Sequence, residues 1–220
     1  MTIRAVFFDV GETLIDETAL WQGWADWLGI PRFTFIAMCG RFIERGEHPV
    51  RAFNALGFDL LAEYQKRVAA GSDEIFTASD LYPDAIPCLQ ALKQQGYFVG
   101  VAGNQPAGLE ESVKRLGLPA DFVGSSSSLD AEKPSPQFFI NLAERTGFAP
   151  DECVSVGDRV DNDIVPAKDA GMRTVWLRRG PWMLTDGSGA DAVIDDLSEC
   201  SAALSLMAGI SRASAEEHNG

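Results

Sequence analysis

Short apolar runs recur along this chain of 220 residues, and amphipathic stretches of helical length separate most of them. A nearly continuous apolar run such as Ala5-Val6-Phe7-Phe8 is typical of a strand buried on both faces, as in a parallel sheet. Strands that alternate with helices of this length predict βαβ units. The expected strands cover residues 3–9, 97–103, 122–125, 153–157, 174–177 and 192–194.

Helical periodicity fills most of the intervals between these strands. Ile86, Leu89 and Leu92 lie three residues apart, and in three other cases a glycine follows the expected helix, as is common where a helix ends. The expected helices cover residues 84–95, 107–116, 136–145 and 164–170. The pattern therefore predicts the α/β fold class, built on a parallel sheet.

Residues 16–80 interrupt this alternation, because they contain no clear strand. Leu20, Trp21, Trp24, Trp27 and Leu28 fall at helical spacing. We expect a helical insertion at 16–80, with residues 1–15 and 81–210 forming the α/β core and residues 211–220 a polar, flexible tail. Core packing between helices is the simpler interpretation of the tryptophans, and a place in the lining of a substrate pocket is the alternative.

The charge and the cysteines of the chain argue against several classes of partner and compartment. Lys and Arg number 18 against 32 Asp and Glu, and the net charge of −14 should repel nucleic acid and an anionic membrane. No apolar run approaches the roughly 20 residues that span a bilayer, and we see no signal-peptide pattern. The 4 cysteines are scattered singly, which favours a reduced, cytoplasmic protein.

Three polar segments lie where an expected strand gives way to a loop, and open α/β sheets bind ligands at the carboxyl ends of their strands. Asp9 can attack a phosphorus or carbon centre, because a carboxylate is ionised at neutral pH and is held rigidly at a strand end. Gly103-Asn104 leads into a helix start, where free backbone N–H groups can hold an anion. Lys133, between turn residues, offers a point charge for an anionic group.

A fourth segment, from Asp158 to Asp163, is rich in carboxylates and can hold a hard divalent cation through oxygen ligands. Each of the four segments also has an ordinary structural interpretation. Asp in a glycine turn, a strand-to-helix turn, a surface lysine and acids at a helix N-terminus are all common without function. The hypothesis of a shared site therefore depends on the four occurring together.

Together and in this order, the segments resemble the haloacid dehalogenase (HAD) superfamily of hydrolases. The matching pieces are residues 8–14, 103–104, 133–136, 157–163 and 167–172. The resemblance implies a Rossmann-like core, in which a parallel sheet carries helices on both faces, and an all-helical cap domain inserted after the first motif.

The resemblance also implies a role for individual residues. Asp9 matches the nucleophile, which in phosphatases of the family becomes an aspartyl-phosphate. Lys133 matches the residue that neutralises charge around the nucleophile and the phosphoryl group. The implied ligands of Mg²⁺ are Asp9, the backbone carbonyl of Gly11, Asp158 and Asp163, and the implied phosphate-binding residues are Gly103, Asn104 and Thr13.

Two positions depart from the family pattern. Family phosphatases usually carry a second Asp two residues after the nucleophile, as general acid and base, where this chain has Gly11. Such help is worth about 10²–10⁴-fold, so we expect slow turnover of poor leaving groups. Gly103 replaces a Ser or Thr hydroxyl, although Asn104 matches a frequent variant. Glu12 is a weak substitute for the missing Asp, because successive residues usually point in different directions.

Three hypotheses for the function follow. The first is a Mg²⁺-dependent phosphatase of a small phosphorylated metabolite. The second is hydrolysis of a C–halogen or C–P bond; dehalogenases usually carry an aromatic residue at the position of Gly11 and need no metal, and C–P hydrolases use a cap lysine, here Lys66. The third is a catalytically weak member that binds a phosphorylated ligand or a protein. Arg32, Arg41, Arg45 and Arg51 are candidate anion contacts, although pairing with acidic side chains is simpler.

Overall fold

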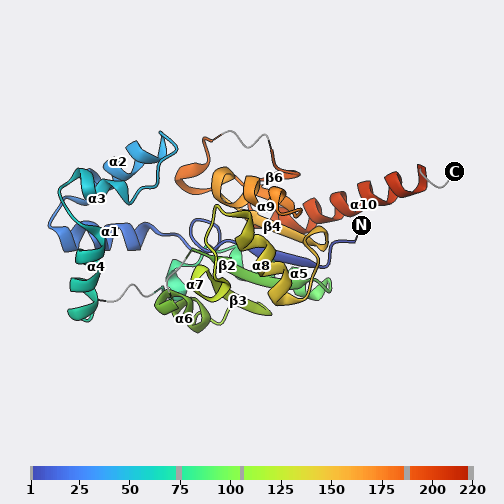
Figure 1. Ribbon diagram of the computed structural model, residues 1–220, viewed down its shortest axis with the longest axis horizontal. Coiled ribbons are helices and arrows are strands. Elements are labelled where there is room, and N and C mark those ends of the chain that lie inside the picture. Colours follow the sequence, from blue (N-terminus) through green and yellow to red (C-terminus); the bar gives the residue numbers. More distant parts are fainter. Residues whose placement is uncertain (1, 73–75, 105–106, 186–188, 218–220) are drawn as a thin grey trace. The chain divides into compact units, whose positions relative to one another are not determined.

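The computed structural model describes residues 2–72, 76–104, 107–185 and 189–217. The chain forms two compact units, a core unit of residues 1–16 and 76–220 and a helical unit of residues 17–75 (Figure 1). The sequence analysis placed the corresponding boundaries after residues 15 and 80. The candidate site residues, from Asp9 to Asp163, all belong to the core unit.

The core unit is built on a parallel sheet, in which the described residues form six strands in the order β3-β2-β1-β4-β5-β6. The strands are β1 (Ala5–Phe8), β2 (Phe98–Gly103), β3 (Phe122–Ser125), β4 (Cys153–Gly157), β5 (Arg173–Leu177) and β6 (Ala192–Ile194). The chain fills one half of the sheet with β1 to β3 and then returns beside β1 with β4. The α/β fold class expected from the sequence is confirmed.

The apolar character of β1 and β4 follows from their central position, where both faces of the sheet are covered. All four residues of β1 and all five of β4 are buried. Ala5 and Phe7 belong to a core cluster that also contains Phe138 and Leu142, and Val6 and Phe8 point to the opposite face. Apolar residues dominate here, since a polar side chain on either face would be buried, and the buried Ser155 of β4 donates its hydroxyl to the Asp163 carbonyl at 3.3 Å.

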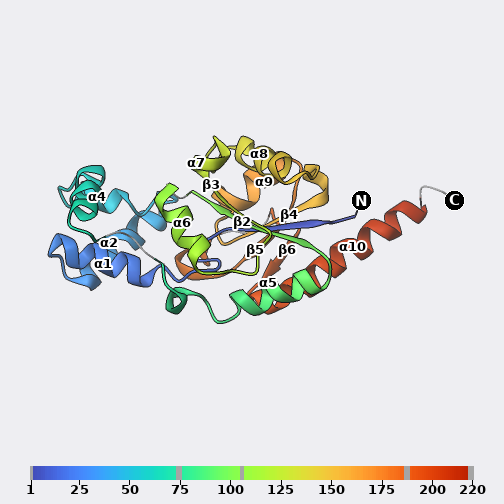
Figure 2. The same ribbon diagram turned by 90° about the horizontal axis from the view of Figure 1, so that it is seen from below.

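Helices lie on both faces of the sheet, as Figure 2 shows with the sheet seen near its edge. One face carries α7 (Ser126–Leu129), α8 (Pro136–Thr146) and α9 (Val165–Asp169), and the other carries α5 (Ala85–Gln94) and α10 (Cys200–Glu217). A further helix, α6 (Ala107–Arg115), packs beside β3. The Rossmann-like arrangement implied by the family resemblance is therefore present.

The chain after β4 differs from the helix expected at residues 164–170. Residues Val160–Ile164 form a turn of π-helix, and α9 begins only at Val165. Pro166 in the first turn of α9 lacks the N–H group that would extend regular helical bonding backward. π turns are found frequently at functional sites, and this one contains Asp163.

The helical unit has a core of its own. Its helices are α1 (Thr18–Leu28), α2 (Arg32–Ile43), α3 (Arg51–Ala55) and α4 (Leu60–Ala69). The rings of Trp24 and Phe53 meet edge to face at a centroid distance of 4.9 Å, and Phe35 meets Phe53 in the same way at 5.3 Å. Trp24 therefore packs in a hydrophobic core, the simpler of the two interpretations considered for the tryptophans.

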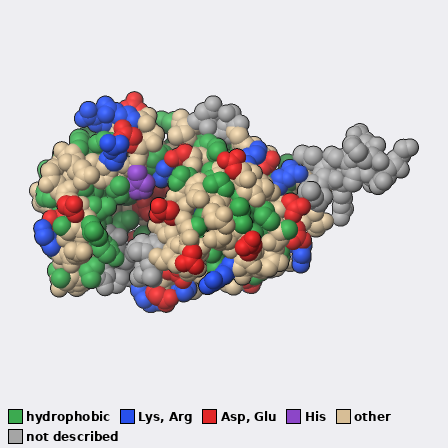
Figure 3. Space-filling model, viewed as in Figure 1, with side chains coloured by type: hydrophobic (Ala, Val, Ile, Leu, Met, Phe, Trp, Pro, Cys, Tyr) green, Lys and Arg blue, Asp and Glu red, His purple; other side chains and the backbone are tan. Residues whose placement is uncertain are grey.

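The C-terminal helix is longer than the sequence pattern indicated. α10 continues to Glu217, so residues 211–217, which the sequence analysis assigned to a tail, are helical. Across the described ranges, we find no helix with the length and apolar character that crossing a membrane requires. Figure 3 shows Asp and Glu side chains spread over the drawn face of the core unit, with Lys and Arg between them.

Candidate active site

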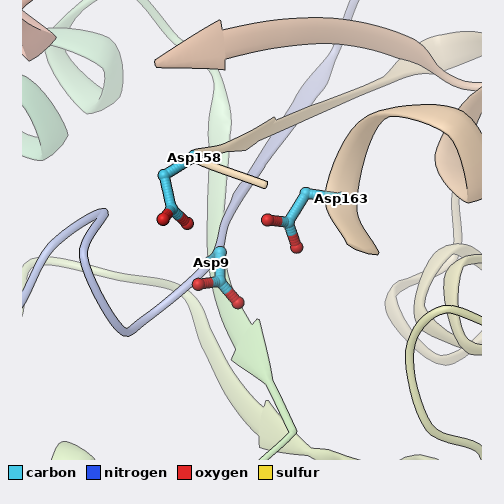
Figure 4. A group of neighbouring side chains, drawn as sticks. All are labelled: Asp9, Asp158 and Asp163. Carbon is cyan, nitrogen blue, oxygen red and sulfur yellow. The ribbon is translucent and has the colours of Figure 1, made fainter. Parts of the chain in front are cut away.

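Three carboxylates meet at the carboxyl ends of the two central strands. Asp9 directly follows β1, Asp158 directly follows β4, and these strands are neighbours. One oxygen from each of Asp9, Asp158 and Asp163 lies within 4.8 Å of the others. Figure 4 shows the three side chains pointing toward a common space. The site lies where the strand order reverses between β1 and β4, the usual ligand position in such sheets.

Lys133 joins two of these carboxylates. Its Nζ atom donates to Asp9 Oδ1 at 2.6 Å and to Asp163 Oδ1 at 2.7 Å, and its side chain is only 2% exposed. The lysine comes from the loop before α8, which the sequence places 124 residues after Asp9. The structure thus brings together the four charged residues singled out from the sequence.

Asp163 reaches the site because β4 ends in a glycine. A Cβ atom built on Gly157 would lie 2.5 Å from the Cβ and Cγ atoms of Asp163, which is too close for any side chain. The π turn brings Asp163 into this position, and its Oδ2 atom accepts the backbone N–H of Arg159 at 3.1 Å. Gly157 and Asp163 therefore form one unit, and a larger residue at 157 would displace the carboxylate.

Asp158 is held by two neighbours, one at its side chain and one at its backbone. Its side chain is nearly fully buried, and the Thr13 hydroxyl lies 3.4 Å from Oδ1. Trp176, on the adjacent strand β5, donates its indole N–H to the Asp158 carbonyl at 2.8 Å. The second carboxylate oxygen, Oδ2, is buried and has no hydrogen-bond partner among the described residues. An unsatisfied buried carboxylate oxygen is costly, and an ion is one of the ordinary explanations for it.

The electrostatics of this cluster favour a cation. Burial, with the charges of Asp163, Asp9 and Glu12, raises the pKa of Asp158 well above its ordinary value. Burial also raises the pKa of Asp163, to about 6, although Lys133 opposes the shift. Burial works against the charge of Lys133, but Asp163 and Asp9 outweigh it and raise the pKa of Lys133. The raised pKa values mean that a cation is needed to stabilise the ionised cluster, in which three carboxylates and one ammonium leave two excess negative charges (3 − 1 = 2) that a divalent cation would balance.

Gly103 and Asn104 lie at the end of β2, the neighbour of β1 on its other side. The Asn104 amide makes a reciprocal pair with the Lys133 backbone, donating to its carbonyl at 2.7 Å and accepting its N–H at 2.8 Å. This contact fixes the loop that presents the Lys133 ammonium. An amide nitrogen carries a second hydrogen, so phosphate binding by Asn104 stays a prediction. Gln105, the next residue in the sequence, lies outside the described residues.

Thr13 and Gly11 lie in the loop after β1, where Gly11 makes an isolated bridge with Ile15. Thr13 is fully buried with its hydroxyl against Asp158, so the structure places it beside the candidate metal ligand. A direct contact of Thr13 with phosphate, and metal binding by the Gly11 carbonyl, stay predictions. The neighbouring Glu12 accepts the Tyr82 hydroxyl at 2.8 Å, which ties its carboxylate to another part of the core unit.

Sequence reasoning missed several residues that hold this site. Trp176 was counted only as part of an apolar strand, and Asn162, whose amide lies 3.3 Å from Asp163 Oδ1, only as part of the acidic segment. The sequence carried no signal for Trp176, because a strand pattern does not reveal which strand will be its neighbour. The amide of Asn162 could have been suspected from its place inside the acidic segment.

Comparisons with known proteins agree with this geometry. A glyceraldehyde 3-phosphate phosphatase of Methanopyrus kandleri is 36% identical over 160 residues, which cover 69% of each chain. A phosphoglycolate phosphatase of Xanthomonas campestris pv. campestris is 30% identical over 78% of this chain and 81% of its own length. A crystal structure of a HAD phosphatase from Thermococcus onnurineus has a TM-score of 0.61 at 27% identity, covering 90% of this chain and 96% of the other.

A family model also matches more than half of the chain. The model described as haloacid dehalogenase-like hydrolase matches residues 3–171, a range that includes every candidate site residue from Asp9 to Asp163. The match and the arrangement of the carboxylates at the ends of β1 and β4 lead to the same conclusion. The chain belongs to the haloacid dehalogenase-like hydrolase family.

Proposed function

We propose that the protein is a Mg²⁺-dependent phosphatase of a small phosphorylated metabolite, and that Asp9 is its nucleophile. The observation that carries the proposal is the convergence of Asp9, Asp158 and Asp163 around the buried ammonium of Lys133. The names of the two curated relatives support a substrate with two or three carbon atoms and one phosphate group.

The residues present fit a magnesium ion. Mg²⁺ prefers hard oxygen ligands and usually takes only one or two protein carboxylates. The buried Oδ2 atom of Asp158 offers such an oxygen, and Asp9 lies within the same cluster. We propose that Asp9, Asp158 and the Gly11 carbonyl bind the ion, and that Asp163, engaged by Lys133 and the Arg159 N–H, supports the metal site. When bound, the ion neutralises charge on the phosphoryl group and on the carboxylates around it.

With Asp9 as the nucleophile, the reaction proceeds through two displacements at phosphorus. In the first, an Asp9 carboxylate oxygen forms a bond to phosphorus while the bond from phosphorus to the leaving oxygen breaks. In the second, water attacks the aspartyl-phosphate, its oxygen bonds to phosphorus, and Asp9 is released together with inorganic phosphate. Lys133, fixed 2.6 Å from Asp9 Oδ1, neutralises negative charge in both steps. Asn104 keeps Lys133 in place through the backbone.

Proton transfer is the weak part of this site. Gly11 has no side chain to protonate the leaving oxygen or to deprotonate the attacking water. The neighbouring Glu12 is engaged by Tyr82, whose hydroxyl donates to Glu12 Oε2. The pKa of Tyr82 is raised, mainly by burial and secondly by the charge of Glu12. We infer that water takes over these proton transfers, and that substrates with good leaving groups are therefore hydrolysed fastest.

Substituting Gly11→Asp is expected to increase turnover, because it returns a carboxyl group to the position of the general acid and base. The gain should reach at least about tenfold and be larger for an alkyl phosphate than for p-nitrophenyl phosphate, since general acid–base help is worth about 10²–10⁴-fold. Steady-state kcat for both substrates measures the effect. Gly189→Asp, at a glycine whose Cβ would meet no atom within 4 Å, is the control. Equal kcat in Gly11→Asp and the wild type would contradict this role.

The metal requirement tests the proposed function directly. Phosphate release from p-nitrophenyl phosphate is expected to fall at least about 100-fold when EDTA replaces Mg²⁺, because the ion then no longer neutralises charge on the phosphoryl group. Chloride release from 2-chloropropionate without metal would instead support the dehalogenase alternative. A protein that binds metal but hydrolyses neither substrate would support the binding hypothesis.

The C–P hydrolase alternative depends on Lys66 in the helical unit. A lysine that forms a Schiff base is usually desolvated or placed beside another cation. The Lys66 side chain is 63% exposed, and its Nζ atom pairs with Glu63 at 2.6 Å. Lys66 is exposed and has an acidic partner instead of a desolvated or cationic surrounding, so the geometry does not support C–P hydrolysis through this residue.

A further inference from the structure

Arg179 is a charged residue that the core unit encloses almost completely. It lies two residues after the end of β5, and its side chain is 12% exposed. Its Nη1 atom donates to the Thr13 carbonyl at 3.1 Å and to Asp84 Oδ1 at 3.0 Å, while Nη2 pairs with Asp84 Oδ2. One guanidinium group therefore joins the segment after β5, the start of α5 and the loop after β1.

The same group also reaches this loop through a tyrosine. The guanidinium carbon lies 4.2 Å from the centroid of the Tyr82 ring, and the Tyr82 hydroxyl donates to Glu12 Oε2 at 2.8 Å. Glu12 has a φ of 53°, in the left-handed region that residues other than glycine rarely adopt. The contacts of Arg179 and Tyr82 thus fix two consecutive residues of the loop, Glu12 by its side chain and Thr13 by its carbonyl.

The residue that follows Arg179 is Gly180, and only a glycine fits at this position. A Cβ atom built on Gly180 would lie 2.4 Å from Glu12 Oε2, and Gly180 itself has a φ of +63°. Any other residue at 180 would both strain its backbone and displace the Glu12 carboxylate from its place near Tyr82. Arg179 therefore binds the loop after β1 through its charged group, and Gly180 leaves room for the Glu12 carboxylate because it has no side chain.

Thr13 connects this arrangement to the candidate metal site. Its carbonyl accepts from Arg179, and its hydroxyl lies 3.4 Å from Asp158 Oδ1. Since Thr13 engages Oδ1, the oxygen of Asp158 that is left for an ion is Oδ2, the buried atom with no partner among the described residues. A shift of the Thr13 backbone would alter which Asp158 oxygen is available and where it points.

We propose that Arg179 is a positioning residue of the active site, which holds the Thr13 backbone so that the Thr13 hydroxyl orients the Asp158 carboxylate for a divalent cation. The effect on turnover rests on the proposed phosphatase function, whereas the effect on metal affinity does not. Partners that orient metal ligands typically contribute 10- to 100-fold to affinity or activity. Loss of Arg179 should therefore lower metal affinity and kcat, and leave KM at saturating metal nearly unchanged.

The neighbouring Arg178 provides a matched control. It makes a bidentate pair with Asp195, with both bonds at 2.6 Å, but its side chain is 46% exposed and that of Asp195 is 60% exposed. Arg178→Met and Arg179→Met thus each remove one arginine that follows β5 and has a bidentate Asp partner, although Arg179 also lies 3.8 Å from Asp196 Oδ2. Of these two arginines, only Arg179 has a hydrogen bond to the loop after β1 among the described residues.

The test measures Mn²⁺ binding by electron paramagnetic resonance, with kcat and KM for p-nitrophenyl phosphate at saturating metal. Arg179→Met is expected to raise the Kd for Mn²⁺ about 10- to 100-fold and to lower kcat at least about tenfold, with KM within about twofold. Arg178→Met is expected to stay within about twofold of the wild type in all three quantities. A folded Arg179→Met variant with wild-type Mn²⁺ affinity and kcat would overturn the inference.

Two further variants keep the test decisive if Arg179→Met does not fold. Asp84→Asn/Arg179→Met removes both charges of the enclosed pair, while the amide oxygen of the new side chain can still accept the Leu197 N–H that Asp84 accepts at 2.9 Å. Arg179→Lys keeps the charge but lacks the planar fork that reaches Asp84 and Thr13 together. Weakened Mn²⁺ binding in whichever variant melts cooperatively supports the inference, and unchanged binding overturns it. A wild type that binds Mn²⁺ but releases no phosphate refutes the proposed function alone.

Discussion

Replacing Asp9 by Asn is expected to reduce hydrolysis of p-nitrophenyl phosphate to the background of the assay. An amide oxygen is a far poorer nucleophile than a carboxylate, so the first displacement loses the group that bonds to phosphorus. Losing a nucleophile should lower kcat by at least about 10³-fold. Phosphate release at saturating Mg²⁺ measures the effect, with acid-quenched samples assayed for phosphate bound to the protein.

Asp195→Asn is the matched control for this substitution. Asp195 also directly follows a strand of the sheet, β6, but its side chain is 60% exposed and pairs with Arg178. It should keep wild-type kcat. The Asp9→Asn variant should still fold, because Lys133 keeps its second carboxylate partner, Asp163. Turnover that survives in Asp9→Asn and scales with its concentration would rule out Asp9 as the nucleophile.

Replacing Lys133 by Met is expected to affect both activity and stability. The ammonium is the only basic group that the described contacts place between Asp9 and Asp163, at 2.6 and 2.7 Å. Without it, negative charge on the phosphoryl group and on Asp9 is less compensated, and kcat should fall at least about 100-fold. Leaving buried carboxylates without their partner should also lower the free energy of unfolding by about 3–5 kcal/mol.

Chemical denaturation in EDTA measures the stability effect, and Lys93→Met is the control. Lys93 also pairs with an aspartate, Asp121, but the two side chains are 37% and 31% exposed. An ion pair at such exposure contributes about 0–1 kcal/mol to the free energy of unfolding. We also expect Lys93→Met to keep wild-type kcat. Equal losses of stability in the two variants would contradict the electrostatic role assigned to Lys133.

Most strands were predictable from the sequence because each is a local pattern. The run from Ala5 to Phe8 is apolar at every position, and burial on both faces of a central strand allows little else. The boundary of α9 was predicted less well. Its apolar periodicity extends back to Ile164, but Pro166 and the packing of Asp163 against Gly157 produce a π turn there.

The charged residues of the site were also predictable, because each stands at the end of a strand or in a short loop. Asp9, Lys133, Asp158 and Asp163 were singled out in this way and lie together. The contacts that hold these residues in place were not predictable from the sequence. The amide of Asn104 bonds the backbone of Lys133, and Arg179 bonds the backbone of Thr13, across 29 and 166 residues of sequence.

The sequence by itself determined the strands, the helices and the chemical groups that the core unit can offer, since these depend on the side chains of short segments. Only the tertiary structure decided that β1 and β4 are neighbours, that Thr13 takes one oxygen of Asp158, and that the other is left buried without a partner among the described residues. The physical reason is that strand order and side-chain pairing depend on contacts between distant segments, which local patterns do not encode.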